Sequence, residues 1–147
     1  MPELTGGRAL LRKLLLGYDG SAQSERALAL AVEIASQNEV SVIHIAYVVR
    51  KPAGAPDPVP DELVESLKRS AAETLLNAER TVKKGLLDAA SHIEVGDPGE
   101  KLLELASALK PDLVVLGALQ HSASEKLVGT TSSHFLKSRP YSLLIVP

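Results

Sequence analysis

A chain of 147 residues is long enough for one ordinary globular domain with a hydrophobic core. The formal net charge of −2 gives no electrostatic reason to expect DNA, RNA or an anionic membrane as a partner. The sequence has no cysteine, which excludes disulfides and thiolate nucleophiles, and its few aromatic side chains leave little on which bases could stack. No apolar run reaches the roughly 20 residues of a membrane span, and the N-terminus lacks a signal-peptide pattern, so we expect a cytoplasmic protein.

The first part of the chain alternates between strand and helix patterns. An apolar run at residues 13–19 ends in a turn signal and predicts a buried strand. Residues 21–37 carry apolar side chains at helical spacing, with Ser21 as the expected N-cap. The β-branched run at residues 40–49 predicts a second buried strand. Four prolines between residues 50 and 60 then predict a loop.

Residues 61–85 have the clearest helix pattern of the chain. We expect Asp61 at the N-cap and Gly85 at the C′ position, where the left-handed conformation favours glycine. One apolar stripe steps along this helix by three or four residues and predicts its buried side. The stripe consists of Val64, Leu67, Ala71, Leu75, Ala78 and Val82.

The remaining patterns predict a short strand around residues 91–95, a helix at 101–110, a strand at 112–118, a helix at 131–139 and a final strand at 141–147. Strands that alternate with helices indicate parallel pairing with helices on both faces of the sheet. We therefore expect a single α/β domain built on a doubly wound parallel sheet.

Ligands bind to such sheets at the carboxyl ends of strands, where the strand order reverses. The segment that leaves the fourth predicted strand has glycine at both ends, because Gly117 closes the strand and Gly129 precedes the predicted helix. The helix N-terminus and the hydroxyls of Thr130 and Thr131 would suit a phosphate. The same residues also fit a plain strand-to-helix loop with Thr130 as N-cap. The chain has neither a Walker A sequence nor a GxGxxG sequence.

Other polar residues allow two interpretations each. Asp19 follows the first predicted strand and could bind ribose hydroxyls or a phosphate-held metal, or it could simply close an Asx-turn. His121 lies in the segment after the fourth strand and could meet a phosphate. We interpret His44 as a packed core residue and expect the histidines to form no set, because no HExxH or His/Asp cluster indicates zinc.

Four stretches in the right order resemble the universal stress protein family over nearly the whole chain. "LLLGYDGSAQSERALALA" is similar to that family's first strand, Asp-Gly-Ser turn and first helix, and "VSVIHIAYV" to its second strand. "VGDPGEKLLELASALKPDLVVLGA" resembles its Gly-x-Pro turn, third helix and fourth strand, and "VGTTSSHFLKSRPYSLLIVP" its closing helix and strand. The resemblance implies a Rossmann-like, five-stranded parallel sheet of order 3-2-1-4-5.

The resemblance also implies a site for an adenine nucleotide, ATP or AMP, with Mg²⁺ only alongside ATP. ATP-binding members carry G-x2-G-x9-G-S/T after the fourth strand. Gly117 matches the first glycine of this pattern, Gly129 the third and Thr130 the Ser/Thr. Gln120 stands where the second glycine is expected, and the following spacer has eight residues instead of nine.

Two matches lie outside this pattern. Asp19 corresponds to the family's acidic residue near the ribose and phosphates, and Ile45 to the second-strand position whose backbone faces adenine.

Three functions remain open at this point. The first is a stress-response module that binds an adenine nucleotide and hydrolyses ATP slowly at most, because no general base stands beside the phosphate loop. The second is a dimeric interaction protein of the same fold whose nucleotide site has decayed at Gln120. The third, a small enzyme acting on another phosphorylated ligand, has only the fold in its favour. The apolar edge strand Ser142 to Val146 predicts a homodimer, as the resemblance also implies.

Overall fold

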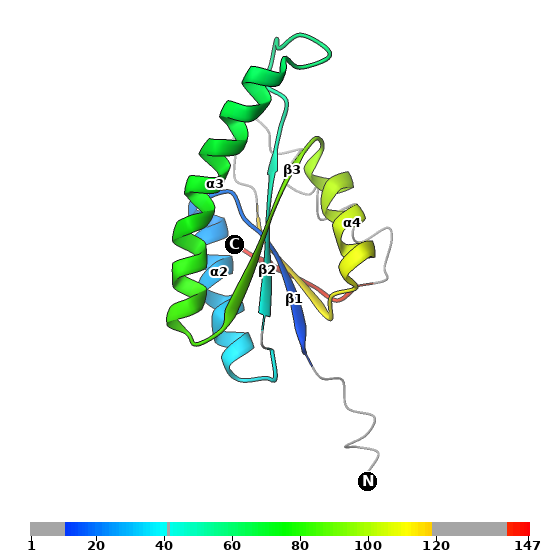
Figure 1. Cartoon of the computed structure of the whole chain (residues 1–147). Coiled ribbons are helices and arrows are strands. Elements are labelled where there is room, and N and C mark those ends of the chain that lie inside the picture. The colour runs from blue at the N-terminus through cyan, green and yellow to red at the C-terminus, as the bar shows by residue number, and fades with distance from the viewer. Residues whose placement is uncertain (1–10, 41, 119–140) are drawn as a thin grey trace.

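The computed structural model describes residues 11–40, 42–118 and 141–147. The elements in these residues are β1 (Lys13–Gly17), α2 (Ala22–Ser36), β2 (Val42–Val49), α3 (Asp61–Lys84), β3 (Asp88–Val95), α4 (Pro98–Leu109), β4 (Leu113–Gly117) and β5 (Leu143–Val146). Figure 1 shows their arrangement around one sheet, in which all strand pairs are parallel. The strand order is β3-β2-β1-β4-β5, which confirms the doubly wound topology. The helix predicted at residues 131–139 lies outside the described residues.

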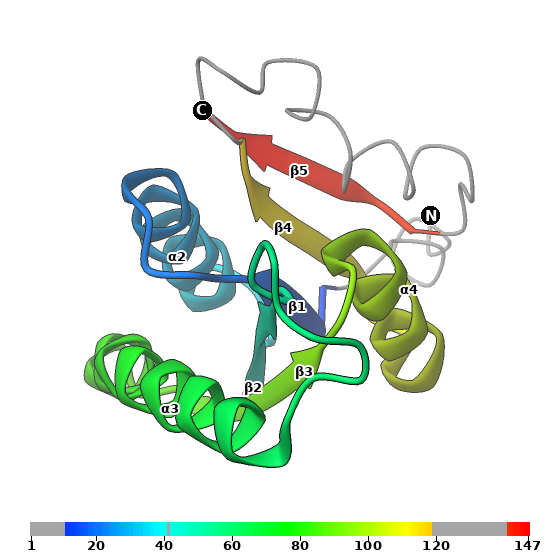
Figure 2. The ribbon, with the colours of Figure 1, turned by 90° about the horizontal axis from the view of Figure 1, so that it is seen from above.

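Helices cover both faces of the sheet. Figure 2 shows α2 and α3 on one side and α4 on the other. β1 is the central strand, and Leu14, Leu15 and Leu16 are fully buried because successive side chains enter the two opposite cores. Among the described residues, no helix combines the length and the apolar character needed to cross a membrane.

The first strand ends earlier than predicted, at Gly17 instead of Asp19. Tyr18 still donates its backbone N–H to the Ala46 carbonyl at 2.9 Å, which keeps the chain beside β2. Gly20 then adopts a φ of +82°, which an L side chain rarely adopts, and the chain turns into α2. The predicted N-cap of α2 is confirmed, since the Ser21 hydroxyl accepts the N–H of Ser24.

Both ends of α3 differ from the prediction. Pro60 is at the N-cap without a side-chain hydrogen bond, and Asp61 is the first helical residue, where its charge still favours the helix dipole. At the other end Gly85 is the C-cap with a φ of −83°, and Leu86 takes the left-handed conformation expected of the glycine. The stripe is buried at Ala71, Leu75, Ala78 and Val82, and only partly buried at Val64 and Leu67.

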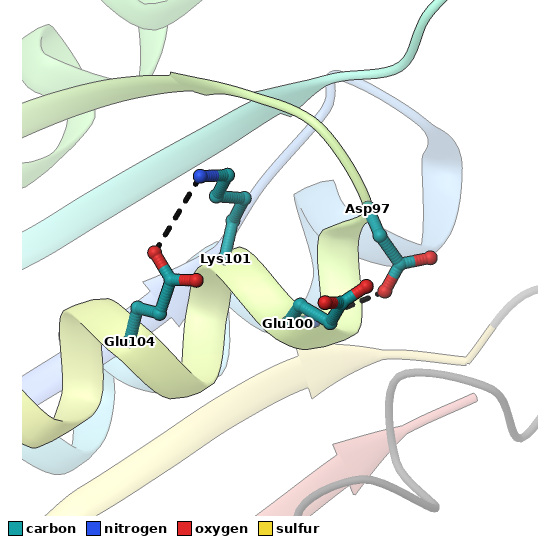
Figure 3. A network of polar contacts seen from close by, with 4 residues as sticks. All are labelled: Asp97, Glu100, Lys101 and Glu104. Atoms are coloured by element: carbon teal, nitrogen blue, oxygen red, sulfur yellow. Dashed lines mark hydrogen bonds and ion pairs between the residues drawn. The ribbon is translucent and has the colours of Figure 1, made fainter.

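Helix α4 begins at Pro98, three residues before the predicted start. The Asp97 carboxylate accepts the N–H of Glu100 at 3.0 Å and caps the helix, and proline suits its first turn (Figure 3). Lys101 pairs with Glu104 on the exposed side, with 3.5 Å between Nζ and Oε1. β3 is also longer than predicted, because it pairs with β2 along its whole length.

Candidate functional site

The turn between β1 and α2 is built from hydrogen bonds among Asp19, Ser21 and Ser24. The Asp19 carboxylate oxygen Oδ1 accepts the N–H of Ser21 at 2.9 Å. Asp19 also donates its own N–H to the Ser24 hydroxyl at 3.3 Å, and the Ser21 hydroxyl accepts the N–H of Ser24 at 3.2 Å. The predicted Asx-turn is therefore present, and it fixes Asp19 at the start of α2.

The last residue of β4 lies against the same turn. A Cβ built on Gly117 would stand 2.7 Å from the backbone carbon of Gln23 and 2.8 Å from the backbone nitrogen of Ser24. Real Cβ atoms essentially never approach backbone this closely, so only glycine fits without movement. Since Asp19 and Gly117 both reach Ser24, the structure brings these two predicted site residues together where the strand order reverses.

Asp19 is exposed to solvent, although neighbouring protein atoms remove part of the hydration of its carboxyl, which acts to raise the pKa. Hydrogen bonds from Ser21 and Ser24 outweigh this effect and leave the pKa below its usual value, so the carboxyl is ionised at neutral pH. An ionised carboxylate accepts hydrogen bonds from hydroxyls and repels phosphate. Asp19 thus suits the ribose of a nucleotide, or a cation between carboxylate and phosphate.

Tyr18 anchors the same turn in the core on the α2 side. Tyr18 is 4% exposed, and its hydroxyl donates a 2.7 Å hydrogen bond to the Glu25 carboxylate. Burial, followed by this hydrogen bond and the charge of Glu25, raises the pKa of Tyr18 above its usual value. The phenol therefore stays protonated and holds the first turn of α2 to the end of β1.

The structure places Ile45 in the middle of β2, where it pairs with Leu16 and Ser91. Its side chain is fully buried, so only its backbone remains for the role that the resemblance implies. The other predicted site residues lie outside the described residues. They are Gln120, His121, Gly129, Thr130 and Thr131.

The sequence reasoning missed Ser24. It is the buried polar residue of the described chain, 4% exposed, and it touches both halves of the site. The spacing Asp19–Ser21–Ser24 was the available signal, because a serine three residues after an N-cap faces back toward the turn.

The interpretation of the histidines was wrong. His44 is partly buried instead of packed in the core, and its Nδ1 lies 2.9 Å from Nε2 of His92. In the described part of the chain, no group of three or more His, Cys, Asp or Glu side chains is arranged to hold a metal.

Comparison with known proteins agrees with the fold and identifies the family. The model of the universal stress protein family matches residues 11–147. A universal stress protein of Methanocaldococcus jannaschii is 27% identical over 97% of this chain and 86% of its own length.

Two solved structures resemble the fold over nearly all of both chains. UspA of Lactobacillus plantarum has a TM-score of 0.80 at 24% identity, covering 95% of this chain and 100% of its own. A universal stress protein solved in complex with cAMP has a TM-score of 0.71 at 25% identity, covering 95% of this chain and 99% of its own. Because the family model spans residues 11–147, this chain belongs to the universal stress protein family.

Proposed function

We propose that this chain binds an adenine nucleotide, ATP or AMP, at the carboxyl ends of β1 and β4 as part of a stress response. The observation that carries the proposal is the meeting of Asp19 and Gly117 at Ser24, on the two strands where the sheet reverses its order. A relative of the same fold that was solved with cAMP supports a nucleotide as the class of ligand.

We propose that Asp19 binds the ribose and that other residues supply hydrogen-bond donors for the phosphates. At the start of α2, the N–H groups of Ser21 and Ser24 are already bonded to Asp19 and to the Ser21 hydroxyl. Those two N–H groups are therefore not free for a phosphate, and we propose that residues 120–131 meet the phosphate chain, where Thr130 and Thr131 supply hydroxyls. Asp19 takes the ribose hydroxyls, and Mg²⁺ accompanies the ligand only when it is ATP.

Any hydrolysis of ATP by this site is slow. The carboxylate at hand, Asp19, has a lowered pKa and is engaged with Ser21, so it is a weak general base. We therefore propose that the protein senses the nucleotide by binding it, and that it is not an efficient enzyme.

Mass spectrometry of nucleotide released from freshly purified protein tests the proposal, followed by calorimetric titration with ATP, AMP and cyclic AMP. We expect binding of at least one of the first two. Asp19→Asn keeps the acceptor for Ser21 but removes the charge, and should weaken binding roughly 10- to 100-fold, the effect of losing a hydrogen bond to a charged group.

Asp97→Asn is a matched control for this substitution. Asp97, like Asp19, is an aspartate between a strand and the helix that follows it, and it caps α4; it follows β3, two strands away from β1. We expect Asp97→Asn to leave the affinity unchanged. Equal losses in both variants, or no nucleotide bound by the unsubstituted protein, would refute the proposed site.

The edge strand β5 also favours a homodimer. If the nucleotide site has decayed, this dimer would be the form in which the protein contacts its partners. The carbonyls of Ser142 and Val146 accept N–H groups from the β4 segment at 2.9 and 2.8 Å. Alternation along the strand turns the backbone groups of Leu143 and Ile145 away from β4, and Ile145 is 40% exposed. Two such edges related by a two-fold axis would pair antiparallel.

A further inference from the structure

His44 of β2 and His92 of β3 lie on the face of the sheet that α4 covers. β3 adds no residue to the core under α4, so the two histidines lie beside this core and not within it. Ala46 and Val48 of β2 belong to that core or pack against it, so His44, two residues before Ala46, faces the same side. His92 pairs with Ala46 across the β2–β3 ladder and shares this face. Both side chains are partly exposed, so solvent ions can reach them.

The two rings face each other through one nitrogen each. Nδ1 of His44 and Nε2 of His92 are 2.9 Å apart, and the ring centres are 5.2 Å apart with the planes inclined by 31°. Within the described residues, neither ring has another hydrogen-bond partner. One nitrogen of each ring thus borders a shared point that lies outside the candidate nucleotide site.

The pKa of each ring lies below its ordinary value of 6.5, so the neutral form predominates at pH 7. Burial, the charge of His92 and the charge of Lys13 lower the pKa of His44. Burial also lowers the pKa of His92, against an opposing effect of Glu94. Neutral imidazole is the form that binds metals. The Lys13 ammonium is itself held by the Leu109 carbonyl at 2.7 Å.

We propose that His44 Nδ1 and His92 Nε2 chelate a divalent transition-metal ion, with water in its remaining coordination positions. Bonds of about 2.0–2.1 Å from nitrogens 2.9 Å apart meet at roughly 90°. This is the angle between neighbouring ligands of a square-planar or tetragonal ion such as Ni²⁺ or Cu²⁺. Glu94 follows His92 by two residues on the same face and adds negative charge beside the ion.

Binding changes the hydrogen bond between the rings but releases no proton. In the neutral pair, one ring holds its proton between the two nitrogens. The ion needs both of these lone pairs, so that ring moves its proton to its outer nitrogen, and both rings turn until their lone pairs converge. Acid opposes binding, because a protonated imidazole has no lone pair for the ion.

Calorimetric titration with NiCl₂ on untagged full-length protein tests the site. The chain has four histidines, so His121→Gln/His134→Gln serves as the reference and keeps only the proposed pair. We expect it to bind one Ni²⁺ per chain. Adding His44→Gln or His92→Gln should weaken binding by more than about tenfold, since even the loss of a residue that merely supports a ligand costs 10- to 100-fold.

A second measurement needs no substitution and so does not depend on the variants folding. Titration of the unsubstituted protein with diamagnetic Zn²⁺, followed by NMR of the histidine rings, should shift the signals of His44 and His92 together. A reference variant that binds no Ni²⁺, an unchanged affinity after either added substitution, or Zn²⁺ shifts confined to His121 and His134 would overturn the proposal.

Discussion

Adding one methyl group at Gly117 is the sharpest test of how β4 meets the first turn of α2. The new Cβ would stand 2.7 Å from the Gln23 backbone carbon, 2.8 Å from its carbonyl oxygen and 2.8 Å from the Ser24 nitrogen. These are backbone atoms of a helix, and they cannot rotate away as the end of a side chain can. Gly117→Ala must therefore push β4 and α2 apart at the candidate site.

The expected cost follows from two opposing effects. Overpacking of this kind typically costs about 1–3 kcal/mol. Alanine also restricts the unfolded chain, which returns about 0.4–1 kcal/mol. The net loss of unfolding free energy then lies between about 0 and 2.6 kcal/mol, and the middle of each range gives about 1.3 kcal/mol. In a domain of this size each kcal/mol lowers Tm by about 2–4 °C, so Tm should fall by about 3–5 °C.

Urea and thermal denaturation measure this loss, and Gly85→Ala is the matched control. Gly85 has an ordinary φ of −83°, and the nearest atom to an added Cβ is Cγ1 of Val32 at 3.1 Å, at the end of a side chain. The restriction of the unfolded chain acts here too and offsets the contacts with Val32 and with the Val82 carbonyl oxygen at 3.3 Å, so Gly85→Ala should cost clearly less than Gly117→Ala. Nucleotide affinity should fall in Gly117→Ala alone. A Gly117→Ala protein as stable as the control would refute the close approach of β4 and α2.

Three further outcomes are expected. Light scattering should show a dimer for the unsubstituted chain and a monomer for Ile145→Pro, which removes an outward-facing donor; a monomeric parent protein would reject the interface. Gln120→Gly with one residue inserted before Gly129 should raise the affinity for ATP in calorimetry if the altered loop has weakened the site, whereas lower affinity would show a loop adapted to its own ligand. The pKa values of His44 and His92 in the folded chain are below the ordinary 6.5. The unfolded chain therefore binds more protons than the folded chain as the pH falls. The stability that the neutral rings contribute is present above about pH 6.5 and is lost as the pH falls through the folded pKa values. Urea midpoints should therefore drop between about pH 7.5 and about pH 5, and by less when both histidines are glutamine; an equal drop would contradict this assignment.

The sequence predicted the sheet well because its strands alternate with amphipathic helices. Its errors have two causes: a local capping signal that resembles a turn, and tertiary pairing that overrides a low strand propensity. The sequence Gly96-Asp97-Pro98 suggests a turn, yet Asp97 caps α4 and Pro98 begins it. β3 carries Asp88 and other polar residues, which lower its strand propensity, but an edge strand with a partly exposed face tolerates them.

Contacts at the two sites differ in how far the sequence can predict them. Asp19 follows β1 and Gly117 ends the neighbouring strand β4, so the topology alone indicated that they lie close together. The contact between His44 and His92 depends on the register that sets Ala46 opposite His92, and a shift of one residue would turn His92 to the other face. The register also decides which backbone groups of β5 point away from β4, and it makes Ile145 the edge position to substitute.

The central place of β1 has a consequence for how the site behaves over time. Strands flank β1 on both sides, and Leu14, Leu15 and Leu16 are fully buried between the two helical layers. Amides of such a strand exchange with solvent deuterium only when the whole domain opens, while edges of the sheet open locally and often. Asp19 is two residues beyond this slowest-exchanging strand. Its carboxylate therefore keeps its position through the local openings that expose the edge strands.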